Sequence, residues 1–400
     1  MEKRVIIVTY IWEESGGTKK VIKAIIKVLE NIKCKVELIT VLFPSPNIPK
    51  EPIPGVNNHY LSTSTSFNNS SVMKDFNGIV KEYDPDFIFF ILGNGYLNIL
   101  IENLSRKYTN RSILYYMDPW FTIEPIKSQV RKVSQKYISI RDKVLSSFKL
   151  PTNALFKRDS ELEEKVQKAI YNQYIFKNIY RILTLSSDIE KFFIKSFNLE
   201  NNSVQTLPLF TDKIMSEAKL NIQYKNTYLY TGRVSSSWKG FGVLLEAMKV
   251  NKDFNLIIYT WDRFESQLAI ELLEKYKIDS KRVKIELNKT TKDIVNIANK
   301  VEGVIIPSIA EGFSFTMLEV MSVGGIVYMG AKFGGPKDVV INGYNGILFK
   351  PGNGKDLAEK IGQKKLKFKY EQISKNAVKT SNEYSFEQFQ NNLLSILRLK

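Results

Sequence analysis

The chain has 400 residues, 44% of them hydrophobic and 25% charged, which fits a soluble globular protein long enough for two domains. One cysteine (Cys34) and one histidine (His59) exclude an internal disulfide and a multi-histidine metal centre, and they disfavour a histidine-based triad. The net charge of +17 favours anionic partners such as nucleotide phosphates or acidic lipids, and a basic solvated surface explains it equally well.

The first half of the chain opens as a β-α-β unit. The apolar run at 4–10 predicts a buried strand, and Gly16-Gly17-Thr18 follows it, with Thr18 as the expected N-cap of a helix. Residues 44–71 contain five prolines and predict a long polar loop that includes His59. Further strands are expected at 35–43, 87–92, 112–117 and 182–185.

A strongly basic segment follows the predicted strand at 112–117. Residues 127–158 carry nine lysines and arginines against a single acidic residue, Asp142, in a mainly helical pattern. Such a helix can lie on an anionic membrane surface or receive an anionic acceptor, and a solvated charged face accounts for it as well.

The second half repeats the alternation of strands and helices. A polar boundary at 198–225 precedes the strand 227–231, and further strands are expected at 255–261, 283–287, 304–306, 325–329 and 346–349. The fold class is therefore α/β, with two doubly wound Rossmann-like parallel-sheet domains. We predict domains at 1–205 and 206–383, with a ligand cleft between them because open parallel sheets bind ligands beyond the carboxyl ends of their strands.

The stretch 303–330 concentrates the residues suited to a ligand site. It reads as buried strand, polar loop, helix, glycine stop and second strand. Gly312 lies in a loop that feeds a helix start, where backbone N–H groups can converge on a diphosphate. Glu311 and Glu319 are eight residues apart, and ionised carboxylates are good acceptors for sugar or ribose hydroxyls.

This half of the chain resembles the nucleotide-binding domain of the retaining glycosyltransferases of family 4 (glycosyltransferase group 1), which have the GT-B fold. The residues that carry the resemblance occur in the family's order over about 115 residues. They are Gly232-Arg233, Lys239-Gly240, Pro307-Ser308, Glu311-Gly312-Phe313, Leu318-Glu319, Gly324, Gly334-Gly335, Asn342-Gly343 and Asn345-Gly346. Gly16-Gly17 matches the family's N-terminal glycine loop. The fold also implies that the last helix, at 384–400, packs back on the first domain.

The resemblance implies a role for each candidate residue. Arg233 and Lys239 bind the diphosphate and stabilise the departing nucleotide without a metal, and no cofactor is expected. Glu311 holds hydroxyls of the donor sugar and Glu319 those of the ribose. The predicted catalytic residues are Glu311, Arg233, Lys239 and Asp118, and the predicted donor-binding residues are Gly16, Gly17, Gly312, Phe313, Ser314, Phe315 and Glu319. Asp84-Pro85-Asp86 is interpreted as a turn rather than as a metal motif.

Two positions depart from the family's pattern. Ser314 stands where the family often has glycine, which makes the loop less permissive. Met117-Asp118 stands where many members carry a histidine. Asp118 can hydrogen-bond a donor or acceptor hydroxyl, or it is a turn residue before Pro119.

The resemblance thus implies a metal-independent retaining glycosyltransferase that moves a sugar from a UDP-, GDP- or ADP-sugar to a hydroxyl of a lipid-linked, glycan or protein-glycan acceptor. The alternatives are a non-catalytic nucleotide-sugar-binding protein and a nucleotide-sugar epimerase, for which one histidine is a poor acid/base set. No nucleic acid partner is expected. We expect a cytoplasmic location, on the inner face of the membrane if 127–158 binds lipid.

Overall fold

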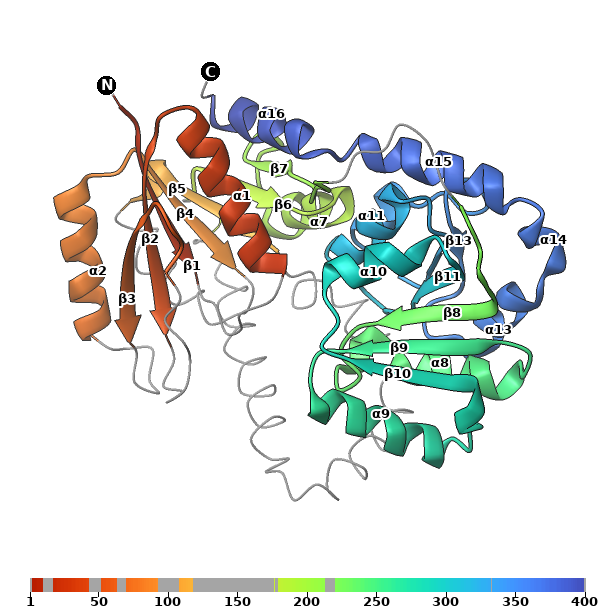
Figure 1. The fold of residues 1–400 in the computed structure, drawn as a ribbon. Coiled ribbons are helices and arrows are strands. Elements are labelled where there is room, and N and C mark those ends of the chain that lie inside the picture. The colour runs from red at the N-terminus through yellow and green to blue at the C-terminus, as the bar shows by residue number, and fades with distance from the viewer. Residues whose placement is uncertain are drawn as a thin grey trace. The chain divides into compact units, whose positions relative to one another are not determined.

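The structure is a computed structural model, and it describes residues 2–9, 17–42, 52–62, 70–92, 108–117, 176, 179–212, 220–331 and 333–398. The chain divides into two compact units. Among the described residues, unit 1 holds 2–117, 176–207 and 390–398, and unit 2 holds 208–389. Each unit is built on one parallel sheet, so the predicted pair of Rossmann-like α/β domains is confirmed (Figure 1).

Unit 1 contains a seven-stranded sheet in the order β3-β2-β1-β4-β5-β6-β7, with every pair parallel. The central strands are apolar runs with both faces covered, as parallel sheets require. The strands are β1 (Arg4–Thr9), β2 (Lys35–Leu42), β3 (Asn57–Ser62), β4 (Phe87–Leu92), β5 (Ser112–Tyr116), β6 (Arg181–Thr184) and β7 (Val204–Thr206). The helices described in this unit are α1 (Gly17–Asn31), α2 (Ser70–Tyr83), the short η1 (Thr109–Arg111) and α7 (Ser187–Phe197).

Two sequence predictions in unit 1 are wrong. The predicted loop at 44–71 contains β3 and the start of α2, and His59 lies on β3 with its Nε2 2.9 Å from Glu37 Oε2 on β2. This edge strand consists mostly of polar residues, so it lacks the apolar run from which a buried strand is predicted. Helix α1 begins at Gly17, and Thr18 is therefore inside the helix rather than its N-cap.

Unit 2 contains a six-stranded parallel sheet in the order β10-β9-β8-β11-β12-β13. The strands are β8 (Tyr224–Thr231), β9 (Asn255–Thr260), β10 (Val283–Leu287), β11 (Val301–Ile306), β12 (Val327–Met329) and β13 (Ile347–Leu348). The helices are η2 (Ser237–Lys239), α8 (Phe241–Val250), α9 (Arg263–Lys275), η3 (Ser280–Arg282), α10 (Thr291–Ala298), α11 (Phe315–Ser322), α12 (Gly335–Val339), α13 (Gly354–Gly362), α14 (Lys364–Lys367) and α15 (Tyr370–Asn382).

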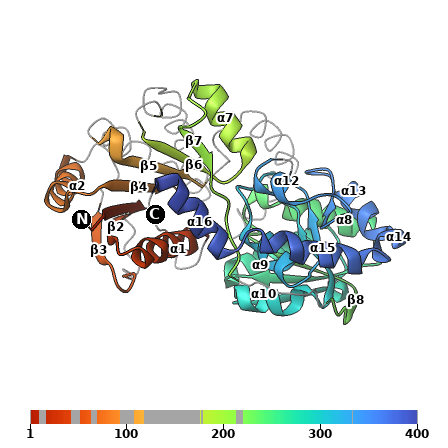
Figure 2. The same ribbon diagram turned by 90° about the horizontal axis from the view of Figure 1, so that it is seen from above.

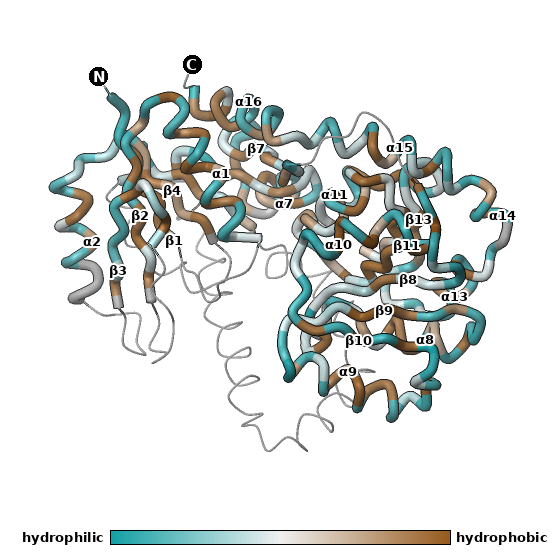
Figure 3. Tube along the Cα trace, viewed as in Figure 1, coloured by the Kyte–Doolittle hydropathy of each residue, from teal (hydrophilic) through white to brown (hydrophobic). Residues whose placement is uncertain are grey.

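Hydrophobic residues are concentrated on the central strands of both units, and they alternate with hydrophilic residues along the helices (Figure 3). In unit 2 all six residues of β11 are buried, and the apolar core joins this sheet to α8, α9, α13 and α15. The glycine at 303 is needed in that core, because a Cβ there would lie 2.7 Å from the ring of Tyr328 on the neighbouring strand. The sheet of unit 2 is thus a rigid platform for the loops at its carboxyl edge.

The last helix, α16, runs from Phe386 to Leu397, and Ser385 Oγ accepts a hydrogen bond from Gln388 N at its start. The division between the units falls inside this helix, after Phe389. Within unit 1, Asn31 Nδ2 of α1 donates to Gln390 Oε1 at 3.3 Å. Within the described part of the chain, no helix has the length and apolar content to cross a membrane.

Candidate functional site

The candidate site is at the carboxyl edge of the unit 2 sheet. Strands β8 and β11 are hydrogen-bonded neighbours in this sheet. The chain leaves β8 through Arg233 and η2 before α8, and it leaves β11 through Glu311 before α11. Because parallel neighbours end at the same edge, residues from distant parts of the sequence meet there.

Lys239 and Glu311 form an ion pair at this edge. Lys239 Nζ lies 2.7 Å from Glu311 Oε1, and Ser308 Oγ donates to the same carboxylate oxygen at 2.5 Å. The Glu311 side chain is only 10% exposed, and that of Lys239 is 31% exposed. Burial of a carboxylate is costly unless it is paired and hydrogen-bonded, and these two donors supply that pairing.

Backbone contacts hold the two loops against each other. Gly240, which precedes α8, has φ +73°, and a Cβ on it would lie 1.9 Å from the carbonyl oxygen of Pro307. Ile309 N donates to Trp238 O at 2.9 Å, also between these loops. The positive φ and the close approach to Pro307 both require glycine at 240. Because the two loops lie in contact there, Lys239 can reach Glu311.

A second pair of glycines supports the loop of Glu311. Gly334 has φ +88°, and a Cβ there would lie 1.8 Å from the Glu311 carbonyl oxygen. Gly335 N donates to Gly312 O at 2.8 Å. The loop that carries Glu311 and Gly312 therefore rests directly on the backbone at the start of α12, which leaves no space for side chains between them.

Helix α11 begins immediately after this loop. Ser314 has φ +86°, a conformation that favours glycine, and its Oγ accepts a hydrogen bond from Met317 N at 3.2 Å as the N-cap. Phe313 is 2% exposed and packs against the ring of Tyr384, with centroids 5.4 Å apart. The ring of Phe315, the first helical residue, packs edge-on against that of Phe210 at 5.9 Å. Both phenylalanines therefore contribute packing that fixes the loop.

Glu319 lies one turn further along α11 and is buried, with 6% of its surface exposed. Its backbone carbonyl accepts a hydrogen bond from Ser322 Oγ at 2.8 Å. Because Glu319 follows Phe315 at a spacing of four residues, it lies on the same face of the helix. The structure thus brings Lys239, Glu311, Gly312, Phe313, Ser314, Phe315 and Glu319 to one edge of unit 2.

Arg233 lies in the loop between β8 and η2, and it is exposed. Tyr230 Oη donates to its carbonyl oxygen at 3.4 Å. Burial, and then the charges of Glu265 and Glu311, raise the pKa of Tyr230 well above its ordinary value, so this hydroxyl stays protonated as a donor. The backbone of Arg233 is therefore anchored, although the residue as a whole is exposed.

Glu265 holds the same loop, although no pattern in the sequence distinguishes it as a site residue. This glutamate in the first turn of α9 is 6% exposed, and it accepts hydrogen bonds from Ser235 N at 2.9 Å and from Ser235 Oγ. The spacing Asp262-x-x-Glu265 indicates only a helix start, since Asp262 caps α9 by accepting from Glu265 N at 2.8 Å. Glu265 is thus a positioning residue for the loop of Arg233.

Two hydroxyls at this edge are buried and have no hydrogen-bond partner among the described residues. They are Ser236 Oγ and Thr260 Oγ1. Ser236 lies between Arg233 and Lys239 in the chain, and Thr260 is the last residue of β9. Ser236 is 7% exposed and Thr260 is 2% exposed. Buried polar atoms are normally paired, so unpaired ones at the edge of a parallel sheet fit a site that takes a polar ligand.

The other predicted site residues belong to the first half of the chain. Gly17 is the exposed first residue of α1, after the carboxyl end of β1. Gly16, Asp118 and the basic segment 127–158 lie outside the described residues. Asp84 and Asp86, interpreted as turn residues, take part in ion pairs. Asp86 Oδ1 lies 3.0 Å from Lys3 Nζ, and Asp84 Oδ1 lies 2.8 Å from Arg111 Nη1.

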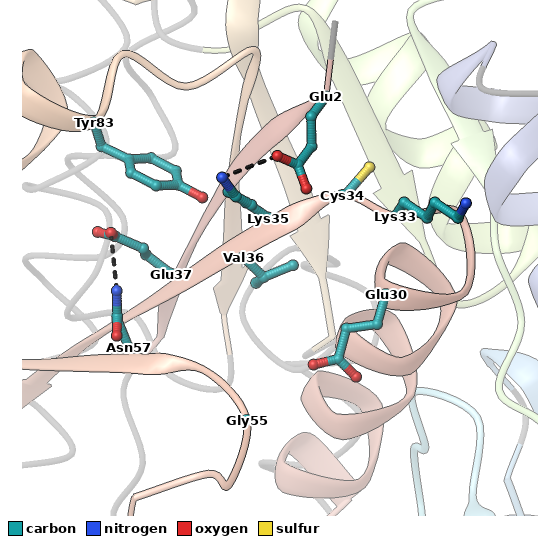
Figure 4. Close-up of a pocket in the computed structure, with 10 residues that line it drawn as sticks. All are labelled: Glu2, Glu30, Lys33, Cys34, Lys35, Val36, Glu37, Gly55, Asn57 and Tyr83. Carbon is teal, nitrogen blue, oxygen red and sulfur yellow. Dashed lines mark hydrogen bonds and ion pairs between the residues drawn. The ribbon is translucent and has the colours of Figure 1, made fainter.

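A cavity of about 360 Å³ in unit 1 is a different kind of feature (Figure 4). It lies near the start of β2, and two of its polar side chains already have partners. Lys35 forms an ion pair with Glu2 at 2.9 Å, and a Glu37 carboxylate oxygen lies 2.9 Å from His59 Nε2. Burial raises the pKa of the Cys34 thiol, which lowers its reactivity. We assign this cavity no ligand.

Residues 212–380 match the family described as glycosyl transferases group 1. The matched range contains every unit 2 residue of the candidate site. A sucrose synthase of Melioribacter roseus is 30% identical to this chain over 149 residues, which are 34% of this chain and 18% of that protein. The chain therefore matches less than a fifth of this curated relative.

Solved structures extend the likeness of fold to the whole chain. The sucrose-phosphate synthase of Thermosynechococcus elongatus has a TM-score of 0.73 at 15% identity, covering 99% of this chain and 98% of that one. The Anabaena protein Alr3699/HepE, solved in complex with UDP and glucose, has a TM-score of 0.68 at 15% identity, covering 99% and 100%. At such identities the comparison shows the fold, and these glycosyltransferase neighbours confirm the predicted GT-B class.

Proposed function

We propose that this protein is a nucleotide-sugar-dependent, retaining glycosyltransferase whose donor binds to unit 2. The observation that carries the proposal is the Lys239–Glu311 pair with Ser308 on the same oxygen, set at the edge of a group 1 domain. The pair places a cation beside a carboxylate. A nucleotide sugar needs both groups, a cation for its diphosphate and an acceptor for its sugar hydroxyls.

Each of these charged side chains has a role in the proposed reaction. Lys239, together with the exposed Arg233, binds the diphosphate and offsets the charge that develops on it as the glycosidic bond breaks. Glu311 accepts hydrogen bonds from hydroxyls of the donor sugar, and Glu319 from those of the ribose. Because these cations supply the electrophilic assistance, we propose that no metal is needed.

The acceptor is a hydroxyl of a lipid-linked, glycan or protein-glycan molecule, and the proposal assigns it to unit 1. The leaving diphosphate oxygen takes the hydroxyl proton as the new bond forms on the face from which the nucleotide departs, so the anomeric configuration is retained. Hexosyl transfer, a cytoplasmic location and the roles of Gly16, Gly17 and Asp118 are part of the same proposal.

Binding is tested first, by thermal shift with UDP-, GDP-, ADP- and TDP-glucose. UDP-glucose is the natural first donor, because the Anabaena neighbour was solved with UDP and glucose. A ligand present at 100 times its Kd adds about 2.7 kcal/mol of stability, which is a readily measured shift. Glu311→Ala and Arg233→Ala should abolish the shift, whereas Glu371→Ala, at an exposed position on α15, should keep it.

Turnover is tested next with the donor that binds. Release of the nucleoside diphosphate should depend on an added hydroxyl acceptor and should persist in EDTA, and NMR of the product should show the anomeric configuration of the donor. A donor that binds but never turns over would favour the non-catalytic binding protein. No stabilisation by any of the four nucleotide sugars would overturn the proposal.

A further inference from the structure

The most exposed large hydrophobic side chain among those described in unit 2 is Phe368, just after α14. It is 89% exposed, against 61% for Ile341 and 54% for Val250. Tyr370, two residues later, is buried at 3% exposure in the core of unit 2. The short link between α14 and α15 is therefore held by the core on one side and presents an aromatic ring to the solvent on the other.

Several lysines lie close to Phe368 in the sequence. Residues 360–369 contain five lysines and no acidic residue. Lys365 and Lys369, on either side of Phe368, are both exposed. Lysines beside an exposed aromatic ring form a surface that is both cationic and apolar.

Lys367 fixes the position of α14. Its Nζ lies 2.5 Å from Glu302 Oε2 at the start of β11 and donates to Asn226 Oδ1 of β8 at 3.0 Å. Tyr224, 46% exposed, lies two residues before Asn226 in β8 and is therefore near α14. Both views show α14 at an outer end of unit 2 (Figures 1 and 2).

We propose that this surface, the α14 patch, docks on a bilayer that contains anionic phospholipid. The α14 patch consists of Tyr224, Lys225, Lys365, Phe368 and Lys369, all of them exposed. The Phe368 ring enters the interface between headgroups and acyl chains, Tyr224 lies at headgroup level, and the lysines contact lipid phosphates. Two observations favour an anionic bilayer as the partner: the lysines complement the charge of lipid phosphates, and nothing else in the described part of the chain explains the exposure of Phe368.

A nucleic acid fits the patch less well. Proteins that bind single strands use several aromatic rings along a groove and favour arginine, whose planar guanidinium both stacks and forms paired hydrogen bonds. Residues 360–369 contain no arginine, and Phe368 stands on a helix end rather than in a groove. Lysines with flexible stems suit a fluid surface of phosphate headgroups better.

The α14 patch is independent of the donor site. It lies beside the first residues of β8, whereas Arg233 and Lys239 follow the last residue of that strand. The opposite ends of one strand thus carry the two functions. Binding to lipid can therefore be measured without any nucleotide sugar, and its outcome is separate from that of the proposed transferase activity.

The test is co-sedimentation of the full chain with vesicles of phosphatidylcholine alone or with half phosphatidylglycerol. We expect binding only to the anionic vesicles. Phe368→Ser should weaken it at least about tenfold, from the loss of one buried aromatic side chain. Lys365→Glu/Lys369→Glu should weaken it further, since each lysine near an anionic surface contributes about fivefold. Both variants should keep the melting temperature of the parent protein.

Matched controls separate the patch from general basicity. Lys249→Glu/Lys252→Glu makes the same charge change at exposed positions around the end of α8, and Ile341→Ser removes another exposed hydrophobic side chain. Both control variants should bind like the parent. Equal binding by the patch and control variants would overturn the proposal, as would equal binding to neutral vesicles or binding to a single-stranded oligonucleotide that anionic vesicles fail to displace.

Discussion

Lys239 Nζ and Ser308 Oγ donate to the same oxygen of Glu311, at 2.7 and 2.5 Å. Lys239 is 72 residues from Glu311 in the sequence, and the two meet because β8 and β11 are adjacent in the sheet. The arrangement fixes the carboxylate at the carboxyl edge and holds a cation beside it. Several consequences for stability can be measured without knowing the substrate.

The first prediction concerns the ion pair itself. Lys239→Ala leaves the Glu311 carboxylate, 10% exposed, with one donor fewer, and should lower the free energy of unfolding by about 1–2 kcal/mol. Glu311→Gln on that background should restore part of the loss, because a neutral amide does not need the cation. Urea denaturation of the two single variants and the double variant forms the required cycle. Strictly additive effects would contradict the coupling.

The second prediction concerns glycines that lie against backbone. Gly240→Ala and Gly334→Ala would place a Cβ 1.9 and 1.8 Å from carbonyl oxygens, so the loops must separate. We expect each to lower the free energy of unfolding by about 3 kcal/mol or more, or to prevent folding. Gly343→Ala is the matched control: its φ is +74°, and a Cβ there meets no atom of the described residues within 4 Å, so only the backbone cost of about 1–2 kcal/mol applies. Equal effects at the three positions would refute this.

The third prediction separates two roles of Ser314. Its hydroxyl caps α11, and its φ of +86° is strained for any residue with a side chain. Ser314→Ala keeps the strain and loses the cap, and should cost about 1 kcal/mol. Ser314→Gly also loses the cap but relieves the strain, so we expect it to be close to neutral. If thermal denaturation found glycine to be the more damaging change, the backbone argument would be wrong.

The sequence predicted the parts of this fold that are marked by apolar runs. Strand β11 and helix α11 are such cases, because a buried parallel strand and a glycine-ended helix leave a clear pattern. Strand β3 was missed because an edge strand with Asn, His and Ser lacks that pattern. The motif residues of unit 2 were found by resemblance, whereas the partners that orient them were not.

Those partners depend on which strands are neighbours. Ser308 was noted only as part of a motif, and its bond to Glu311 depends on the shape of the loop after β11. Glu265 reaches Ser235 because β9 lies beside β8 and delivers α9 to the same edge. Sequence spacing contains no information on the order of strands in a sheet, so contacts between successive β-α units become visible only in the structure.

The fourth prediction concerns acid stability and rests on Glu286 in β10. Hydrogen bonds from Lys284, at 2.8 Å, and from Lys289, at 2.7 Å, lower the pKa of this carboxyl from its ordinary value of 4.5. The unfolded chain therefore takes up a proton at a higher pH than the folded one. The contribution to stability is fully present above pH 4.5 and is lost as the pH falls through the lowered pKa of the folded state.

Glu286→Gln removes this proton uptake. Its free energy of unfolding should therefore fall less than that of the parent protein as the pH is lowered from about 6 to about 3, and high salt should reduce the difference because the lysines are partly exposed. Glu371→Gln, at an exposed position on α15, is the control and should retain the parent's pH dependence. Parallel pH profiles for the parent and Glu286→Gln, measured by urea denaturation at each pH, would show that the two lysines do not stabilise the carboxylate selectively in the folded state.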